Sequence, residues 1–140
     1  MKLTPVFNFA GQCEQAMELY GQAFGTQPDF ILRYADADPR DWQRSLTDEQ
    51  KRYVYHAEMT IAGQRCFFSD LVEFDVARGT ALFLTVTFDE APQVLRAYDA
   101  LKDGATVLWE PHATTYSSCF TSLVDRFGVR WGLMTEQTER

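Results

Sequence analysis

The chain has 140 residues, a length typical of one domain, and 46% of them are hydrophobic, which excludes a disordered chain. The net charge is −7 and no Lys/Arg cluster is present, which excludes nucleic-acid and anionic-membrane partners. No stretch approaches the ~20 apolar residues of a membrane span and no signal peptide is visible, so we expect a cytoplasmic protein.

The first part of the chain predicts a strand, a helix and a second strand. The apolar run Leu3–Ala10 is typical of a strand, and Gly11 ends it. Apolar side chains then recur at helical spacing over residues 13–24, and Gly25 supplies a C-cap, which together predict an amphipathic helix. A short second strand is expected over Phe30–Tyr34.

Residues 35–52 are polar and highly charged, and Pro39 interrupts any regular pattern. Within them, the sequence from Thr47 to Gln50 matches a capping box and predicts one short helical turn. Two interpretations stay open. The favoured one is a plain surface loop, and the other is a mobile flap that carries Trp42 over a site.

Strict alternation over Tyr53–Ile61 predicts a half-buried strand with a polar second face that carries His56 and Glu58. Its apolar face is expected to comprise Tyr53, Tyr55, Ala57, Met59 and Ile61. A tight turn at residues 62–64 then leads into a strand over Arg65–Asp70.

The second half repeats this order. A strand is expected over Ala81–Phe88, followed by a helix with Asp89 as N-cap that runs to about Lys102. The apolar stripe of that helix is predicted to be Val94, Leu95, Tyr98 and Leu101. Three further strands are expected, over Ala105–Trp109, Tyr116–Val124 and Val129–Met134.

These elements predict an α+β fold, a single domain over residues 1–140 made of two βαβββ modules. The first module spans about 1–72, a connector 73–80, and the second module about 81–136. One helix covers only one face of a four-stranded sheet. The other face therefore requires a ligand or a partner subunit, and a homodimer is expected.

Several short motifs, in order and at matching spacing, resemble the PhnB-like branch of the vicinal oxygen chelate superfamily. This superfamily holds glyoxalase I, extradiol dioxygenases and the fosfomycin- and bleomycin-resistance proteins. The matching segments are Thr4–Gly11, Glu14–Gly25, His56–Glu58, Ile61–Gly63, Ser69–Asp70 and Asp125–Trp131. One segment departs from the branch, because Tyr116–Phe120 lacks the Gly and the basic residue that the branch carries there.

The resemblance also implies where a metal would bind. The four ligand positions of the superfamily's metalloenzymes correspond to Pro5, Phe68, Phe83 and Gly132, and none of these side chains ligates a metal. Asp70 is the nearest carboxylate if the register slips. We therefore expect no cofactor. A divalent metal held by the two histidines and a nearby carboxylate is the disfavoured alternative.

The function expected from this resemblance is metal-independent binding of a small organic molecule in a cleft lined by the sheets. An aromatic bowl with a few carboxylates suits a flat or cationic ligand. The side chains expected to line it are Phe7, Phe9, Asp70, Phe83, Thr85, Thr87 and Phe120, beside His56 and Glu58.

Two alternatives remain for these residues. The same aromatic side chains would also suit the core of a dimer interface. Alternatively, the protein is a lyase or isomerase in which His56 and Glu58 act as an acid–base pair, with or without a divalent metal. The three cysteines are odd in number and far apart, so we expect buried, reduced thiols rather than disulfides.

Overall fold

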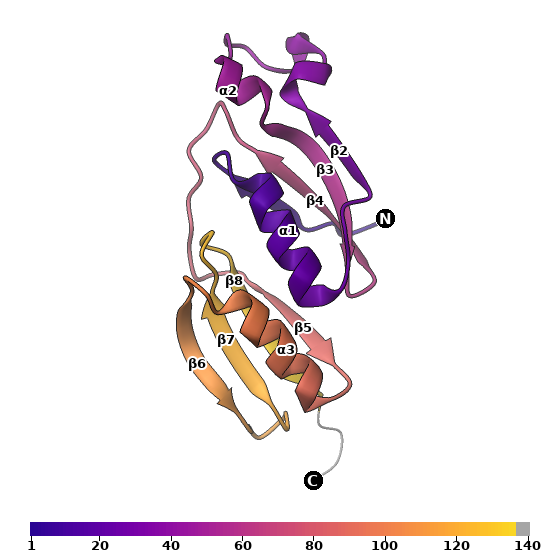
Figure 1. The fold of residues 1–140 in the computed structure, drawn as a ribbon, viewed down its shortest axis with the longest axis vertical. Coiled ribbons are helices and arrows are strands. Elements are labelled where there is room, and N and C mark those ends of the chain that lie inside the picture. Colours follow the sequence, from indigo (N-terminus) through magenta and orange to yellow (C-terminus); the bar gives the residue numbers. More distant parts are fainter. Residues whose placement is uncertain (137–140) are drawn as a thin grey trace. The chain divides into compact units, whose positions relative to one another are not determined.

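The computed structural model describes residues 1–136 and divides the chain into two compact units, Met1–Ala77 and Arg78–Arg140. Each unit is a four-stranded sheet with one long helix across it (Figure 1). The first unit comprises β1 (Val6–Phe9), α1 (Cys13–Phe24), β2 (Phe30–Arg33), β3 (Val54–Ile61) and β4 (Gln64–Asp70). The second comprises β5 (Leu84–Phe88), α3 (Ala91–Leu101), β6 (Thr106–His112), β7 (Phe120–Val124) and β8 (Arg130–Thr135).

The two sheets share one topology. The strand order is β1-β4-β3-β2 in the first and β5-β8-β7-β6 in the second. In each, the first pair is parallel and the other two pairs are antiparallel. This confirms the predicted α+β fold with two βαβββ modules. Among residues 1–136, no helix is both long and apolar enough to cross a membrane.

In the first unit, α1 buries one face of the sheet. Met17 and Tyr20 of the helix are fully buried, as are Phe9 of β1 and Phe68 of β4. The rings of Phe7 and Phe68 stack with their centroids 4.7 Å apart, which adds directional packing to the burial of apolar area. Gly25 ends α1 in the left-handed conformation, at the position predicted from the sequence.

The predicted alternation along β3 is correct in its second half and wrong in its first. Ala57, Met59 and Ile61 are buried as expected, but Val54 is buried in place of the tyrosines. The register to β2 shifts at this point, because Leu32 pairs with His56 whereas Arg33 pairs with Val54. This bulge adds one residue, Tyr55, to β3. The side chains that precede the bulge therefore point to the face opposite to the one predicted by simple alternation.

Several boundaries in the second unit differ from prediction. β5 begins three residues later than expected and β7 four residues later, whereas β6 continues to His112. The helix begins after Glu90, not Asp89, and the side chain of Gln93 accepts a hydrogen bond from the Glu90 backbone N–H at 2.9 Å. Its buried stripe is Val94, Ala97 and Leu101, whereas Leu95 is 43% exposed.

Residues 34–52, called the inserted segment below, connect β2 to β3. They contain two short 3-10 turns, Tyr34–Asp36 and Pro39–Asp41, and the one-turn helix α2 (Asp48–Lys51). The predicted capping box is present, because Gln50 N–H donates to Thr47 Oγ1 at 3.1 Å and Thr47 N–H to Gln50 Oε1 at 3.0 Å. The segment is therefore a mostly exposed connection that contains three short helical turns.

Candidate functional site

Each sheet has one face covered by its helix and one face that the helix leaves open. α1 packs on β3 and β4, and α3 packs on β5, β7 and β8, as can be followed in Figure 1. Because side chains alternate along a strand, the neighbours of the buried residues point to the open face. His56 and Glu58 lie on the open face of the first sheet, and Thr85 and Thr87 on that of the second.

His56, Glu58 and Arg65 form an ionic network on the first open face. His56 Nε2 lies 2.9 Å from Glu58 Oε2, and Arg65 Nε donates to Glu58 Oε1 at 2.6 Å. The hydrogen bonds from His56 and, next, from Arg65 lower the pKa of Glu58. An ionised carboxylate only accepts hydrogen bonds, so the proton of this contact belongs to Nε2, and Nδ1 is the nitrogen left to act as a base.

Aromatic rings hold this network in place. The His56 ring meets Phe67 edge-on with centroids 4.8 Å apart, and the Arg65 guanidinium lies 5.0 Å from the Phe67 centroid. The His56 side chain is still 35% exposed. The imidazole is therefore fixed in orientation and reachable from solvent.

Three other residues predicted for this face lie on the opposite one. Phe7, Phe9 and Asp70 are 6%, 1% and 1% exposed, and all three face α1. The aromatic side chains of β1 are buried under the helix because this removes apolar area from water, and Val6 and Asn8 lie on the open face instead. Thus the expectation that Phe7, Phe9 and Asp70 share one face with His56 and Glu58 is wrong.

Asp70 instead joins three parts of the first unit. Its Oδ1 accepts hydrogen bonds from Gly11 N–H at 2.8 Å and Cys13 N–H at 3.0 Å, and its Oδ2 accepts one from Val54 N–H at 3.0 Å. Burial raises the pKa of Asp70, and the three backbone donors oppose part of that rise. This arrangement fixes the start of α1 and the start of β3 to the end of β4.

The four predicted residues of the second half do share an open face. Thr85 and Thr87 on β5 pair with Gly132 and Met134 on β8, and Phe120 on β7 pairs with Met134 as well. Phe83, one residue before β5, is 37% exposed. A Cβ on Gly132 would lie 2.6 Å from the Thr85 hydroxyl and 3.4 Å from the Phe83 ring, so glycine is what allows this close approach.

Arg130 is a residue of this face that sequence reasoning missed. Its guanidinium carbon lies 4.0 Å from the centroid of the Phe83 ring, a cation–π contact. Its Nε is buried, and no described residue accepts a hydrogen bond from it. The repeat contained a signal for it. Phe67 and Gly132 occupy corresponding positions of the two sheets, and an arginine precedes each by two residues, Arg65 in the first and Arg130 in the second.

The corresponding arginines differ in what surrounds them. Phe67 pairs with Glu58 in the first sheet, and Gly132 pairs with Ser122 at the corresponding position of the second. Arg65 therefore has a carboxylate beside it, whereas Arg130 has a serine whose hydroxyl donates to the Trp131 carbonyl at 3.0 Å. Among the described residues, Arg130 on the second open face thus has no acidic partner like the one that Arg65 has on the first.

Further aromatic side chains border Phe120. The rings of His112 and Tyr116 meet the Phe120 ring edge-on, with centroids 5.8 and 6.1 Å away. Trp109 is 60% exposed and Tyr116 52% exposed. The surface of the second unit therefore carries exposed aromatic side chains.

The residues present do not fit a metal centre. Phe68, one of the four expected ligand positions, is fully buried under α1, and Asp70 also faces the helix. Within residues 1–136, His, Cys, Asp and Glu side chains nowhere gather in a group of three that could hold a metal ion. The open face offers Asn8 and Ser69 at this point, and their side chains bond to each other at 2.8 Å.

The three cysteines are free and buried, as predicted. Burial raises the pKa of Cys13, Cys66 and Cys119 above the ordinary thiol value. These side chains are therefore protonated thiols rather than nucleophilic thiolates.

Comparison with known proteins gives a consistent family. The family model described as 3-demethylubiquinone-9 3-methyltransferase matches residues 1–134. The crystal structure of protein PA1353 from Pseudomonas aeruginosa is 24% identical, with 98% of each chain covered and a TM-score of 0.84. A putative 3-demethylubiquinone-9 3-methyltransferase, PhnB protein, from Bacillus cereus is 26% identical, with 96% of this chain and 99% of that chain covered and a TM-score of 0.78.

The fold extends to more distant proteins. A glyoxylase/bleomycin resistance protein/dioxygenase domain from Frankia is only 10% identical, yet covers 100% of this chain and 95% of its own with a TM-score of 0.67. At that identity the likeness concerns the fold alone. The two proteins therefore share the repeated βαβββ architecture.

Proposed function

Because the chain belongs to the family described as 3-demethylubiquinone-9 3-methyltransferase, within the glyoxalase/bleomycin-resistance superfamily, we propose that it binds a small organic molecule without a metal. The ligand lies on the open face of the second sheet and carries an acidic group. The protein acts by sequestering this ligand. The methyl transfer named in the family description is not part of this proposal.

The observation that carries the proposal is the buried Nε of Arg130, which has no acceptor among the described residues. Leaving a buried donor unsatisfied costs about 1–3 kcal/mol, so the site gains when a ligand oxygen accepts this hydrogen bond. Charge-assisted hydrogen bonds of arginine to carboxylates are among the stronger polar contacts in proteins. A carboxylate or phosphonate on the ligand would take the place that Glu58 takes beside Arg65.

The surroundings of Arg130 suit the rest of such a ligand. The Phe83 and Phe120 rings supply apolar area, and the hydroxyl groups of Thr85 and Thr87 supply donors and acceptors on exposed strand positions. Ligand sites combine apolar walls with a few polar groups in this way. The expected preference for a cationic ligand loses its basis, because Asp70 faces the helix and Glu58 is already paired with Arg65 and His56.

Amide NMR titrations with benzoate, and with benzamide as the neutral analogue, test this function. We expect benzoate to shift the amides of Thr85, Thr87 and Gly132 saturably and more strongly than benzamide does. Arg130→Gln should weaken benzoate binding about tenfold through loss of the charged donor. The matched control is Arg65→Gln, since Arg65 occupies the corresponding position in the first sheet, and it should leave those shifts unchanged.

Two results would contradict the proposal. One is equal binding of benzoate to the Arg130→Gln variant and the unaltered chain. The other is a set of shifts that avoids β5 and β8 altogether.

A second candidate is a lyase or isomerase in which His56 moves a proton. The observation that favours it is the 2.9 Å contact between His56 Nε2 and Glu58 Oε2, which orients the imidazole and leaves Nδ1 as the base. Turnover of an α-keto acid or a thiol adduct, abolished in His56→Ala and only reduced in Glu58→Gln, would support this function. Absence of any turnover that depends on His56 would remove it.

The predicted homodimer stays a prediction, and its test is the mass in solution. Trp109 and Tyr116 are exposed aromatic side chains of the kind enriched at interfaces. Light scattering after size exclusion should give twice the chain mass, and Trp109→Ser should lower it if these side chains lie in the interface.

A further inference from the structure

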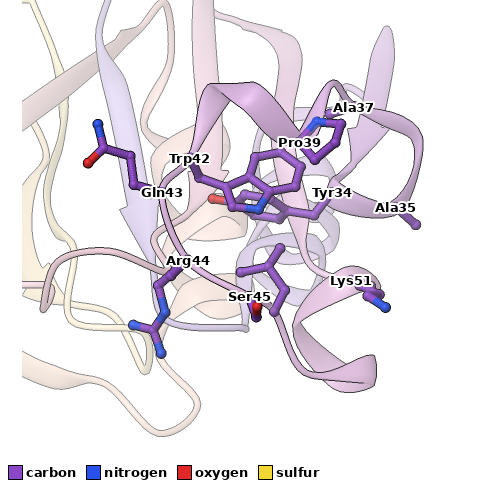
Figure 2. Close-up of a pocket in the computed structure, with 10 residues that line it drawn as sticks. Tyr34, Ala35, Ala37, Pro39, Trp42, Gln43, Arg44, Ser45 and Lys51 are labelled. Carbon is purple, nitrogen blue, oxygen red and sulfur yellow. The ribbon is translucent and has the colours of Figure 1, made fainter.

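The inserted segment lines an open pocket of about 640 Å³ in the first unit. Figure 2 shows Trp42 against Tyr34 and near Pro39, with Arg44 and Lys51 on either side of Ser45. Ligand pockets of ~300–1,000 Å³ are the usual size for a small organic molecule. None of the residues that line this pocket belongs to either open sheet face.

One wall of the pocket is aromatic and firmly held. The Trp42 ring meets Tyr34 edge-on with centroids 5.1 Å apart and Tyr55 with centroids 5.7 Å apart. The Tyr34 hydroxyl donates to the Asp70 carbonyl at 2.6 Å, which fixes that ring to the end of β4. Trp42 is itself half-buried and forms part of this wall, and the mobile flap considered from the sequence stays a prediction.

Hydrogen bonds hold the segment in this shape. Arg44 Nη1 donates to the Val72 carbonyl at 2.8 Å, and Gln43 N–H donates to Glu73 Oε1 at 2.7 Å. The Tyr55 hydroxyl donates to Asp41 Oδ2 at 2.9 Å. A pocket already held open spends less binding free energy on ordering its walls.

The charged side chains that line the pocket are cationic, although the chain as a whole is acidic. Three carboxylates lie on or beside the same segment but outside the lining, those of Asp41, Asp48 and Glu73. Arg44 and Lys51 are the charged residues of the lining, and no carboxylate belongs to it. Within residues 1–136 no carboxylate forms an ion pair with Arg44, whereas Lys51 Nζ forms a long one, 3.8 Å from Oδ1 of the exposed Asp48. The nearby Asp38 is paired with Arg40 instead.

We propose that this pocket is a second ligand site, which binds a planar aromatic molecule with one carboxylate. The aromatic part packs on Trp42 and Tyr34, beside Pro39 and Leu46. The carboxylate is attracted by Arg44 and Lys51, because their charges are the ones the pocket presents and no acidic side chain of the lining opposes them.

The experiment uses naphthoate as the probe and naphthamide as its neutral analogue, followed by amide and indole NMR. Naphthoate should shift the Trp42 indole N–H and the amides of residues 35–46 saturably, and naphthamide should bind about tenfold more weakly. Arg44→Gln should raise the Kd of naphthoate about tenfold and Lys51→Gln about threefold, the latter less because Lys51 already has Asp48 as an ion-pair partner.

The matched control is Arg40→Gln, which removes an arginine of the same segment that does not line the pocket. It should change the Kd by less than about twofold, because exposed charges at this range are screened. Arg130→Gln should also leave the Trp42 shifts unchanged, which separates this site from the one proposed on the second sheet.

The proposal is overturned if naphthamide binds as well as naphthoate, or if Arg40→Gln weakens binding as much as Arg44→Gln. It is also overturned if naphthoate leaves the Trp42 indole N–H unshifted. Because Arg44 also bonds the Val72 carbonyl, its variant can alter the segment itself, and Lys51→Gln tests the charge without that contact.

Discussion

The first unit ends β4 with Asp70 and the second ends β8 with Thr135, at corresponding points of one topology. Asp70 pairs with Phe9 across the parallel ladder, and Thr135 pairs with Phe88 in the same way. Both residues are buried, and both bond to the start of the neighbouring antiparallel strand. The end of the strand is therefore bonded to the start of its neighbour by a carboxylate in the first unit and by a hydroxyl in the second.

The helix N-termini explain the difference. In the first unit Gln12, the N-cap of α1, makes no side-chain capping bond, and Asp70 accepts from Cys13 N–H in its place. In the second unit the side chain of Gln93 accepts from the Glu90 N–H, so the helix carries its own acceptor. A buried carboxylate is favourable beside unpaired N–H groups at a helix start, whereas a strand end without them needs only a hydroxyl.

The largest effect is expected from removing the carboxylate. Asp70→Ala leaves the N–H groups of Gly11, Cys13 and Val54 without their acceptor, and should lower the free energy of unfolding by about 3 kcal/mol. Urea unfolding measures the loss, and hydrogen exchange should speed up at those three amides. Asp36→Ala, at an exposed carboxylate of the same unit, should be close to neutral. Retained protection at Val54 in Asp70→Ala would contradict this role.

A smaller loss is expected at the corresponding threonine. Thr135→Val removes the acceptor of the Ser118 and Cys119 N–H groups, and should cost about 1–2 kcal/mol. The loss is smaller than at Asp70 because Ser117 Oγ still accepts from Cys119 N–H at 3.2 Å. Thr135→Ser keeps the hydroxyl and serves as the control in the same unfolding experiment. Equal losses in Thr135→Val and Asp70→Ala would remove the contrast between the units.

The helix caps give the next contrast. Gln93→Ala removes the local acceptor of α3 and should cost about 0.5–1 kcal/mol, whereas Gln12→Ala should be nearly neutral, since α1 is capped from the sheet by Asp70. Thermal unfolding of the two variants measures the difference. A loss in Gln12→Ala as large as that in Gln93→Ala would show that the distant cap does not replace a local one.

Periodic features of this fold could be predicted from the sequence, and side-chain direction at irregular points could not. The helix over residues 13–24 was predicted to the residue, because its apolar spacing and Gly25 agree on where it ends. The reversed phase before Ala57 depends on a bulge opposite β2, a tertiary feature that no local pattern in Tyr53–Ile61 contains.

The shared face of the candidate site residues could be predicted from the sequence only in part. Phe83, Thr85 and Thr87 follow one another at a spacing of two residues, which predicts one face for all three. Phe120 joins them because β5 and β7 both pair with β8. Phe7 and Phe9 alternate just as regularly, but which of their two faces meets the helix depends on α1 packing. Arg130 was missed because an unpartnered donor is a property of its neighbours and not of its own segment.

The smallest effect is expected on the open faces of the two sheets. Glu58 of the first sheet occupies the position that corresponds to Ser122 of the second. His56 and then Arg65 lower the pKa of Glu58 in the folded protein. A lowered folded-state pKa means that this carboxylate stabilises the fold above the ordinary glutamate value, and that the contribution is lost as pH falls through the folded-state pKa.

We therefore expect His56→Ala and Arg65→Gln each to raise the pKa of Glu58, His56→Ala by more, since its contact is the larger cause. Carbon NMR of the Glu58 carboxyl across an acid titration measures both shifts. Arg130→Gln is the control, because no described carboxylate pairs with this corresponding arginine, and the variant should leave the Glu58 titration unchanged. A Glu58 pKa that stays low in both first-sheet variants would show that the two contacts do not hold its charge, and Arg65 would then be as free to meet an acidic ligand as Arg130.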